Sequence, residues 1–108
     1  MTSYLLIESR DPFESHGLAQ RCELASALVA EGAQVTLFLV ENGVLAAREA
    51  AQVREIEELG RLGVTVLADD FALRERGITP AQLAREVKPS LIDALVEELG
   101  RGAKAIWN

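Results

Sequence analysis

The one side chain in this 108-residue sequence that could act as a thiol nucleophile is Cys22. A reactive cysteine needs exposure and a positively charged surrounding, because the thiolate is the attacking species. Cys22 instead recurs with Leu18, Ala25 and Val29 at the spacing of one helical face, which predicts a buried position. We therefore interpret Cys22 as a core residue, with nucleophilic chemistry at this thiol as the alternative.

Two adjacent carboxylates, Asp69 and Asp70, follow an apolar run at residues 64–67. Together with Asp11 and Glu14 they could ligate a hard divalent cation, since Mg²⁺ and Ca²⁺ prefer carboxylate oxygens. The competing interpretation is that an aspartate at this point caps a helix and complements its dipole. Capping needs only one residue and local geometry, so we expect capping here.

His16 is the only histidine, and a histidine can serve as a general base near neutral pH. It falls close to the start of the first predicted helix, where the helix dipole disfavours a positive charge. No nucleophile at matched spacing accompanies it, so a surface position in a loop is the simpler interpretation. The glycines form neither G-x-G-x-x-G nor G-x-x-x-x-G-K-[ST], so nucleotide binding is unsupported and no cofactor is predicted.

Short apolar runs separated by helical patterns must position these groups. Strands are predicted at residues 4–9, 35–40, 64–67 and 104–107. The first predicted helix contains the apolar stripe with Cys22 and ends at Gly32. Further helices are predicted at residues 44–62, 71–76 and 91–99, and another helix is predicted to start at residues 79–82. Residues 88–90 are expected to form only a boundary, and the last helix is expected to pack through Leu91, Ile92, Leu95 and Leu99.

This alternation of strands and helices predicts one α/β domain over residues 1–108. The expected architecture is a three-layer sandwich with a mostly parallel sheet of about four to five strands and helices on both faces. In such folds, ligands bind at the carboxyl ends of the strands. The candidate ligand-binding residues at those ends are Asp11, Glu14, His16, Asn42, Asp69 and Asp70.

The composition and the charge of the chain argue against several classes of protein function. A net charge of −6 argues against a nucleic-acid binder, because phosphate backbones attract basic surfaces. The longest uncharged run, at residues 32–40, is far shorter than the ~20 apolar residues of a membrane span. The first residues lack the basic segment of an export signal, so a cytoplasmic location is expected. A single cysteine cannot form an internal disulfide, and no cysteine–histidine cluster suggests a metal site.

Several motifs occur in a characteristic order along the chain. A strand at 4–9 is followed by Asp11-Pro12-Phe13-Glu14-Ser15, and a helix–strand unit follows at 25–38. Next come Asn42-Gly43-Val44 and, at 63–78, the segment GVTVLADDFALRERGI. Taken together over essentially the whole length, this order and spacing resemble the DsrE/DsrF-like family of small sulfur-relay proteins.

The resemblance implies an α/β domain that assembles into homo-oligomers, often trimers or hexamers, or into hetero-oligomers with DsrE-family relatives. It also implies intracellular sulfur handling, in which active members pass a persulfide sulfur to a partner protein from a cysteine just after the third strand. Counting back from Arg76-Gly77, that position is Asp69 in this chain. A carboxylate cannot carry a sulfane sulfur, and Cys22 lies in the first helix and does not correspond to the family cysteine.

Three functions are then considered, in order of preference. The first is a non-catalytic binding or structural subunit that associates with itself or with cysteine-bearing relatives, since a small domain gains core by assembly. The second is a sulfur carrier that uses Cys22, which requires an accessible thiol with a lowered pKa. The third is a site for a divalent metal or a small ligand at the rim formed by Asp11, Glu14, Asp69 and Asp70.

Overall fold

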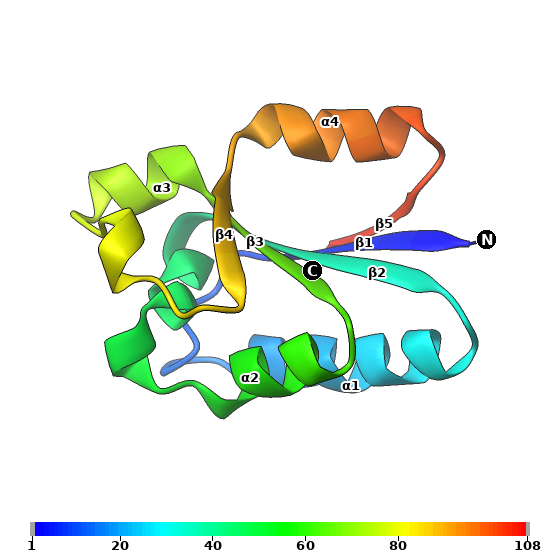
Figure 1. Cartoon of the computed structure of the whole chain (residues 1–108), viewed down its shortest axis with the longest axis horizontal. Helices are drawn as coiled ribbons and strands as arrows, with labels where there is room; N and C mark the ends of the chain where they lie inside the picture. Colours follow the sequence, from blue (N-terminus) through cyan, green and yellow to red (C-terminus); the bar gives the residue numbers. More distant parts are fainter. Residues whose placement is uncertain (1, 108) are drawn as a thin grey trace.

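Five strands lie side by side in the order β4-β3-β2-β1-β5, and every neighbouring pair is parallel (Figure 1). The arrangement is that of a computed structural model, which describes residues 2–107. The strands are β1 (Ser3–Glu8), β2 (Gln34–Leu39), β3 (Thr65–Asp69), β4 (Val87–Ser90) and β5 (Lys104–Trp107). Because the strands are parallel, the carboxyl ends of β1, β2 and β3 meet at one edge of the sheet.

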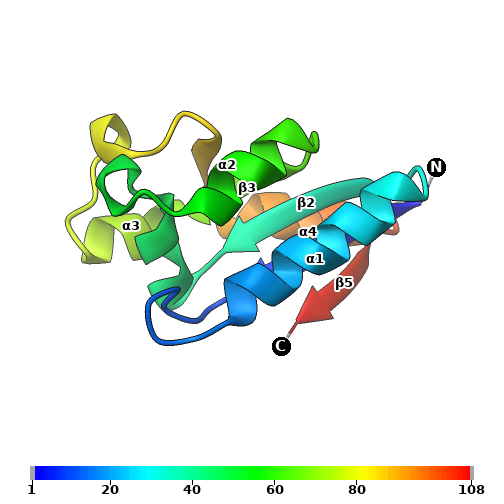
Figure 2. The same cartoon turned by 90° about the horizontal axis from the view of Figure 1, so that it is seen from below.

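Helices cover both faces of this sheet. α1 (Gly17–Ala30) and α2 (Arg54–Arg61) lie on one face, as Figures 1 and 2 show, while α4 (Ile92–Gly100) lies on the other. α3 (Asp70–Glu75) lies beyond the carboxyl ends of the strands, and its buried Ala72 and Leu73 join the same core cluster as α1 and α2. Three short 3-10 segments complete the connections: η1 (Glu41–Ala47), η2 (Glu49–Ala51) and η3 (Pro80–Gln82). The predicted three-layer α/β fold is therefore confirmed.

The two faces of the sheet bury unequal amounts of apolar surface. On the face covered by α1 and α2, strand residues such as Leu6, Leu37 and Val66 join a large core cluster. The other face holds a smaller cluster, made of Leu5, Ile7, Phe38, Val40 and Leu95. The central strands are apolar on both faces, as strands covered on both sides must be.

The prediction for the first helix is confirmed. Leu18, Cys22 and Ala25 are buried, and Val29 packs against the same core. Gly32 follows the last helical turn with a φ of +88°, a left-handed conformation that glycine adopts without strain.

The continuous helix predicted at 44–62 is wrong. η1 and η2 occupy its first half, and the α-helix begins only at Arg54. Gln52 ends η2 with φ 49° and ψ 47°, a left-handed conformation that no α-helix can contain. Val44, Ala46 and Ala47 of η1 are buried in the main core, so tertiary packing overrides the helical pattern here.

The segment between α3 and α4 also differs from the prediction. The helix start expected at 79–82 is only one 3-10 turn, although the Thr79 N–H does donate to Gln82 Oε1 at 2.8 Å. Residues 88–90, expected to be only a boundary, belong to strand β4, whose first residue Val87 pairs with Val66 of β3. Pro89 concealed this strand in the sequence, because proline is tolerated in a sheet only at an edge, which is where β4 lies.

The apolar stripe predicted for the last helix is mostly exposed. Leu95 is buried, but Leu91, Ile92 and Leu99 are exposed. α4 is a nine-residue helix that touches the sheet with one side only, so its neighbouring apolar side remains open. Within residues 2–107, no helix is long and apolar enough to cross a membrane.

Candidate functional site

The structure divides the candidate ligands into two groups at the carboxyl edge of the sheet. Asn42, Asp69 and Asp70 lie in η1, at the end of β3 and in α3. Asp11, Glu14 and His16 lie in the loop between β1 and α1. Among the residues that the structure describes, no hydrogen bond or ion pair joins one group to the other.

Asp69 caps α3. Its backbone is extended, with φ −61° and ψ 118°, and its Oδ2 accepts the N–H of Ala72 at 3.2 Å. Asp70, in the first turn of the helix, pairs with Arg74 at 3.2 Å on the surface. The capping expectation for this acidic pair is confirmed, and an N-cap bond of this kind stabilises a helix by about 1 kcal/mol.

Asn42 is held by Arg76, which the sequence analysis did not identify as a residue of the site. Asn42 Oδ1 accepts hydrogen bonds from Arg76 Nε at 3.3 Å and from Nη2 at 3.0 Å. Arg76 Nη1 also donates to the carbonyl of Ala72 at 3.1 Å. The planar guanidinium has enough donors to serve both partners, and it ties η1 to the end of α3.

The second group stabilises its own loop. Asp11 Oδ1 accepts the N–H of Phe13 at 2.8 Å, and Ser15 Oγ accepts the N–H of Gly17 at 3.0 Å. His16 is the N-cap residue of α1 but makes no side-chain capping bond. It lines a cavity of about 290 Å³ between this loop and the start of α2, where Arg54 is also found.

Glu8 is a buried carboxylate that no sequence motif marks. It ends β1 and is 1% exposed; its Oε2 accepts the N–H of Arg10 at 2.9 Å. Its Oε1 has no hydrogen-bond partner among the described residues. A Cβ at Gly17 would collide with this carboxylate, and a Cβ at Gly43 would collide with the Glu8 carbonyl. The two glycines therefore let α1 and η1 approach the end of β1 closely.

Cys22 lacks the exposure and the lowered pKa of a reactive thiol. It is 7% exposed, and its Sγ donates to Glu58 Oε2 of α2 across 3.8 Å. Burial, followed by the negative charge of Glu58, raises the pKa of Cys22 to about 11. The predicted core position of this residue is confirmed, and its surroundings suppress the thiolate.

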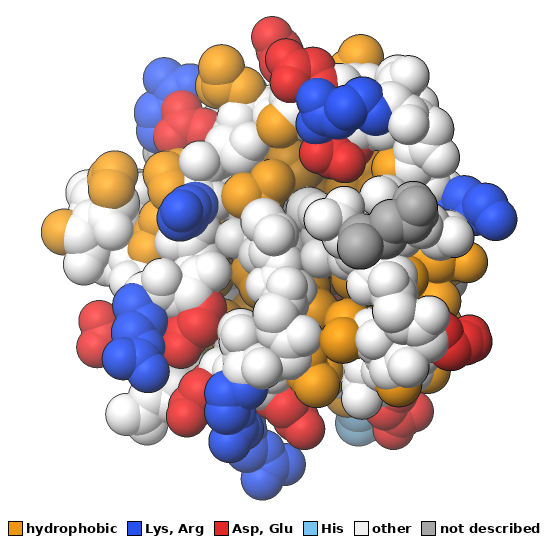
Figure 3. All heavy atoms as spheres, turned by 45° about the vertical axis from the view of Figure 1, so that its right-hand side comes forward, with side chains coloured by type: hydrophobic (Ala, Val, Ile, Leu, Met, Phe, Trp, Pro, Cys, Tyr) orange, Lys and Arg blue, Asp and Glu red, His pale blue; other side chains and the backbone are white. Residues whose placement is uncertain are grey.

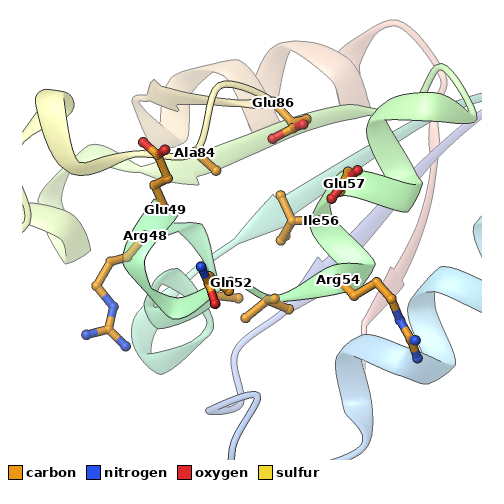
Figure 4. Close-up of a pocket in the computed structure, with 10 residues that line it drawn as sticks. Arg48, Glu49, Gln52, Arg54, Ile56, Glu57, Ala84 and Glu86 are labelled. Atoms are coloured by element: carbon orange, nitrogen blue, oxygen red, sulfur yellow. The ribbon is translucent and has the colours of Figure 1, made fainter.

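A cavity near this edge is lined by other residues than the predicted ones. It has a volume of about 350 Å³ and lies between η2, the start of α2 and the chain that leads into β4 (Figure 4). Arg48 and Arg54 extend outward at its two ends. Its apolar lining consists of Ala46, Val53, Ile56 and Ala84. The remaining charged residues around it are Glu49, Glu57 and Glu86. None of the candidate ligands lines this cavity.

A second cavity, of about 360 Å³, opens at the opposite, amino-terminal edge of the sheet. Figure 3 shows this side of the molecule, where apolar side chains appear in the hollows between charged groups. Glu98 and Arg101 at the end of α4 line the cavity and form an ion pair at 2.6 Å.

The geometry gives no support to a metal site. Within the described part of the chain, no three side chains of His, Cys, Asp or Glu are arranged to hold a metal ion. The Asp69 carboxylate caps α3, and the Asp11 carboxylate accepts a hydrogen bond within its own loop. The acidic rim predicted from the sequence is therefore not a single cluster.

A sequence model of the DsrE/DsrF-like family matches residues 2–107. The chain belongs to this family. No curated protein matches the sequence. The family match agrees with the order of motifs described above, from the loop after β1 to the end of α3.

Solved structures with the same fold are similar to this DsrE/DsrF-like chain over nearly its whole length. The ychN protein from E. coli superimposes with a TM-score of 0.90 at 20% identity, covering 100% of both chains. MTH1491 from Methanobacterium thermoautotrophicum, a protein of unknown function, gives 0.83 at 19% identity, covering 99% of this chain and 98% of its own. BT1422 from Bacteroides thetaiotaomicron, also of unknown function, gives 0.80 at 17% identity, with coverages of 98% and 94%. At these identities the likeness establishes the fold alone.

Proposed function

We propose that this DsrE/DsrF-like protein serves sulfur metabolism as a non-catalytic binding subunit, which associates with copies of itself or with cysteine-bearing relatives. The observation that carries the proposal is the use made of Asp69. The family resemblance places the sulfur-carrying cysteine of active members at this position, just after the third strand. Here the position holds a carboxylate whose Oδ2 accepts the Ala72 N–H and caps α3.

Cys22 does not replace the missing thiol. A persulfide carrier must expose its sulfur to both donor and acceptor, and its thiolate must be populated near neutral pH. Cys22 is buried against α2, and its pKa is raised to about 11. Both properties are the reverse of what the sulfur-carrier alternative requires, so they support a role in packing.

The rest of the carboxyl edge supports binding rather than chemistry. Arg76 and Asn42 hold η1 against α3, and the buried Glu8 carboxylate abuts the start of α1. These bonds fix the shape of the surface around Asp69. A rigid edge of this kind can dock onto another protein, because no ordering of loops opposes association. The assembly we propose is an oligomer, such as the trimers or hexamers that the family resemblance implies.

Peptide mapping by mass spectrometry after treatment with a persulfide donor tests this function. We expect the unmodified protein to gain no sulfur, and an Asp69→Cys variant to gain sulfur at residue 69. An Asp69→Asn variant, which lacks the thiol but is similar in size, should remain unlabelled. Sulfur on Cys22 of the folded, unmodified protein would overturn the proposal.

A further inference from the structure

Large apolar side chains remain exposed beside α4 and at the end of β5. Ile92, Val96 and Leu99 are 49%, 61% and 42% exposed, and Trp107 is 61% exposed. The three helix residues recur at i, i+4 and i+7, so they line one side of α4 next to the sheet-facing Leu95. This pattern is a continuous apolar side rather than scattered single residues.

Trp107 lies on the same face of the sheet as α4. Ile106 packs against the core on the α1/α2 side, and successive strand residues point to opposite faces. α4 runs from β4 back across the sheet to β5, which is the crossover of a right-handed connection. Successive residues of a right-handed α-helix are about 100° apart around its axis. Because Leu95 faces the sheet, this rotation places Ile92, Val96 and Leu99 on the side of α4 that points toward β5. We call this surface the β5 strip; it comprises Ile92, Val96, Leu99, Ala105 and Trp107.

The strip borders an unprotected sheet edge. β5 is hydrogen-bonded to β1 on one side, and within residues 2–107 no strand pairs with its other side. The opposite edge strand, β4, contains Pro89, which cannot donate a ladder hydrogen bond and so discourages strand addition. β5 has no proline, and its Lys104 is turned over the Tyr4 ring, 5.9 Å from the ring centroid. Only one edge of the sheet is therefore suited to pairing.

We propose that β5 pairs antiparallel with β5 of a second copy around a two-fold axis, so that two sheets become one continuous sheet. This inference rests on the proposed function, since it identifies a surface for self-association. In antiparallel pairing, directly opposed residues share a face of the sheet. With Ile106 opposite its own copy at the axis, Trp107 lies opposite Ala105 of the second copy, and this contact occurs twice. The small Ala105 side chain leaves room for the indole on the face that α4 flanks.

The strip supplies about two thirds of the area at which specific dimer interfaces begin. If a fully exposed large apolar residue offers about 200 Å², the four exposed side chains leave about 400 Å² per copy uncovered. Two copies together then supply about 800 Å² of apolar surface, and the paired β5 backbones add to it, against the ~1,200 Å² at which specific interfaces begin. No member of the β5 strip is charged, so two chains with a net charge of −6 each can meet through a neutral surface.

Sedimentation velocity combined with tryptophan emission tests the surface, because Trp107 is the only tryptophan. We expect an assembly with an even number of copies that dissociates on dilution, with emission moving to longer wavelength in step. Trp107→Ser and, separately, Val96→Glu should each weaken association at least tenfold. Phe13→Ser, which removes an aromatic ring 63% exposed in the β1–α1 loop, is the matched control and should leave association unchanged.

Two results would overturn the two-fold β5 contact. An assembly with an odd number of copies that ignores both strip variants would place self-association on another surface and leave the proposed function standing. A protein that stays monomeric at high concentration would remove self-association itself, whereas only sulfur on Cys22 would contradict the non-catalytic role.

Disulfide trapping tests the register independently. Opposed Cβ atoms in an antiparallel pair lie about 4.5–5.5 Å apart, close to the spacing that a disulfide spans. Ile106→Cys should therefore give a covalent dimer on mild oxidation. Lys88→Cys on the β4 edge is the matched control and should stay monomeric under reducing-agent-free gel conditions. Equal trapping of both variants would contradict the assignment of the interface to β5.

Discussion

Cys22 should ionise well above the range of an exposed thiol. Burial is the larger cause and the neighbouring carboxylate of Glu58 the next, and together they raise the pKa of Cys22 from 9.0 to about 11. A pKa higher by two lowers the thiolate fraction near neutral pH by about 100-fold. Because the thiolate is the nucleophile, alkylation of folded Cys22 by a small neutral reagent should be slower than in the unfolded chain by at least about 100-fold.

The pH dependence of the alkylation rate measures this pKa directly. Glu58→Gln removes the negative charge beside the Cys22 Sγ, so the pKa of Cys22 should fall toward 9.0. Glu57→Gln is the matched control, because Glu57 lies on the same helix but is not among the charges that act on Cys22. An inflection at or below pH 9 in the unmodified protein would contradict the raised pKa of Cys22 and its assignment as a packing residue.

The same ionisation affects stability at high pH. The thiol loses its proton more readily in the unfolded chain than in the folded one, so its contribution is complete below about pH 9. As the pH rises from 9.0 toward about 11, the free energy of unfolding should fall, by up to about 3 kcal/mol. Urea denaturation of Cys22→Ala and the unmodified protein across this range checks the effect. Identical pH slopes in the two proteins would contradict it.

Three further substitutions test the carboxyl edge. Gly17→Ala should lower the free energy of unfolding by about 1–3 kcal/mol, since the new Cβ collides with the Glu8 carboxylate. Gly100→Ala meets open space and should instead be neutral or stabilising by up to ~1 kcal/mol, so equal effects in urea denaturation would be inconsistent with the collision. Asp69→Ala should cost about 1 kcal/mol through loss of the α3 cap, and an unchanged unfolding midpoint would argue against that cap. Arg76→Ala should speed hydrogen exchange in η1, because it frees Asn42; unaltered protection would show that the pair does not hold this segment.

The strands could be predicted because a strand that is buried on both faces consists of an uninterrupted run of apolar residues. Residues 35–40 form an uninterrupted apolar or β-branched run, and β2 (Gln34–Leu39) occupies nearly the same positions. β5 coincides with the predicted range of 104–107. The stripe of α1 was equally plain, since its helical spacing ends at Gly32, whose left-handed backbone suits only that residue type well.

The errors have physical causes that act between distant segments. The run at 44–62 has helical spacing, but Val44, Ala46 and Ala47 are drawn into the core at the ends of the strands, and this packing replaces the first helical turns with η1 and η2. β4 is stabilised by its pairing with β3 rather than by strand-forming residues of its own. Neither of these contacts can be predicted from the residues of the segment itself.

The candidate site shows the same division between local and distant causes. Capping by Asp69 could be predicted because an N-cap is decided within four residues. The pairing of Asn42 with Arg76, 34 residues away, and the burial of Glu8 against Gly17 depend on how β1, η1 and α3 meet. Such contacts become visible only when the fold brings those elements to one edge.

Native mass spectrometry of the unmodified protein, recorded after incubation with a persulfide donor, tests whether the protein assembles without carrying sulfur. One spectrum reports both the number of copies in the assembly and any sulfur gained by each chain. We expect an oligomer whose mass is two or more times that of the 11.7 kDa protomer, with no added sulfur. A protomer that carries an extra sulfur atom on Cys22 would contradict it, because the protein would then function as a carrier rather than through binding.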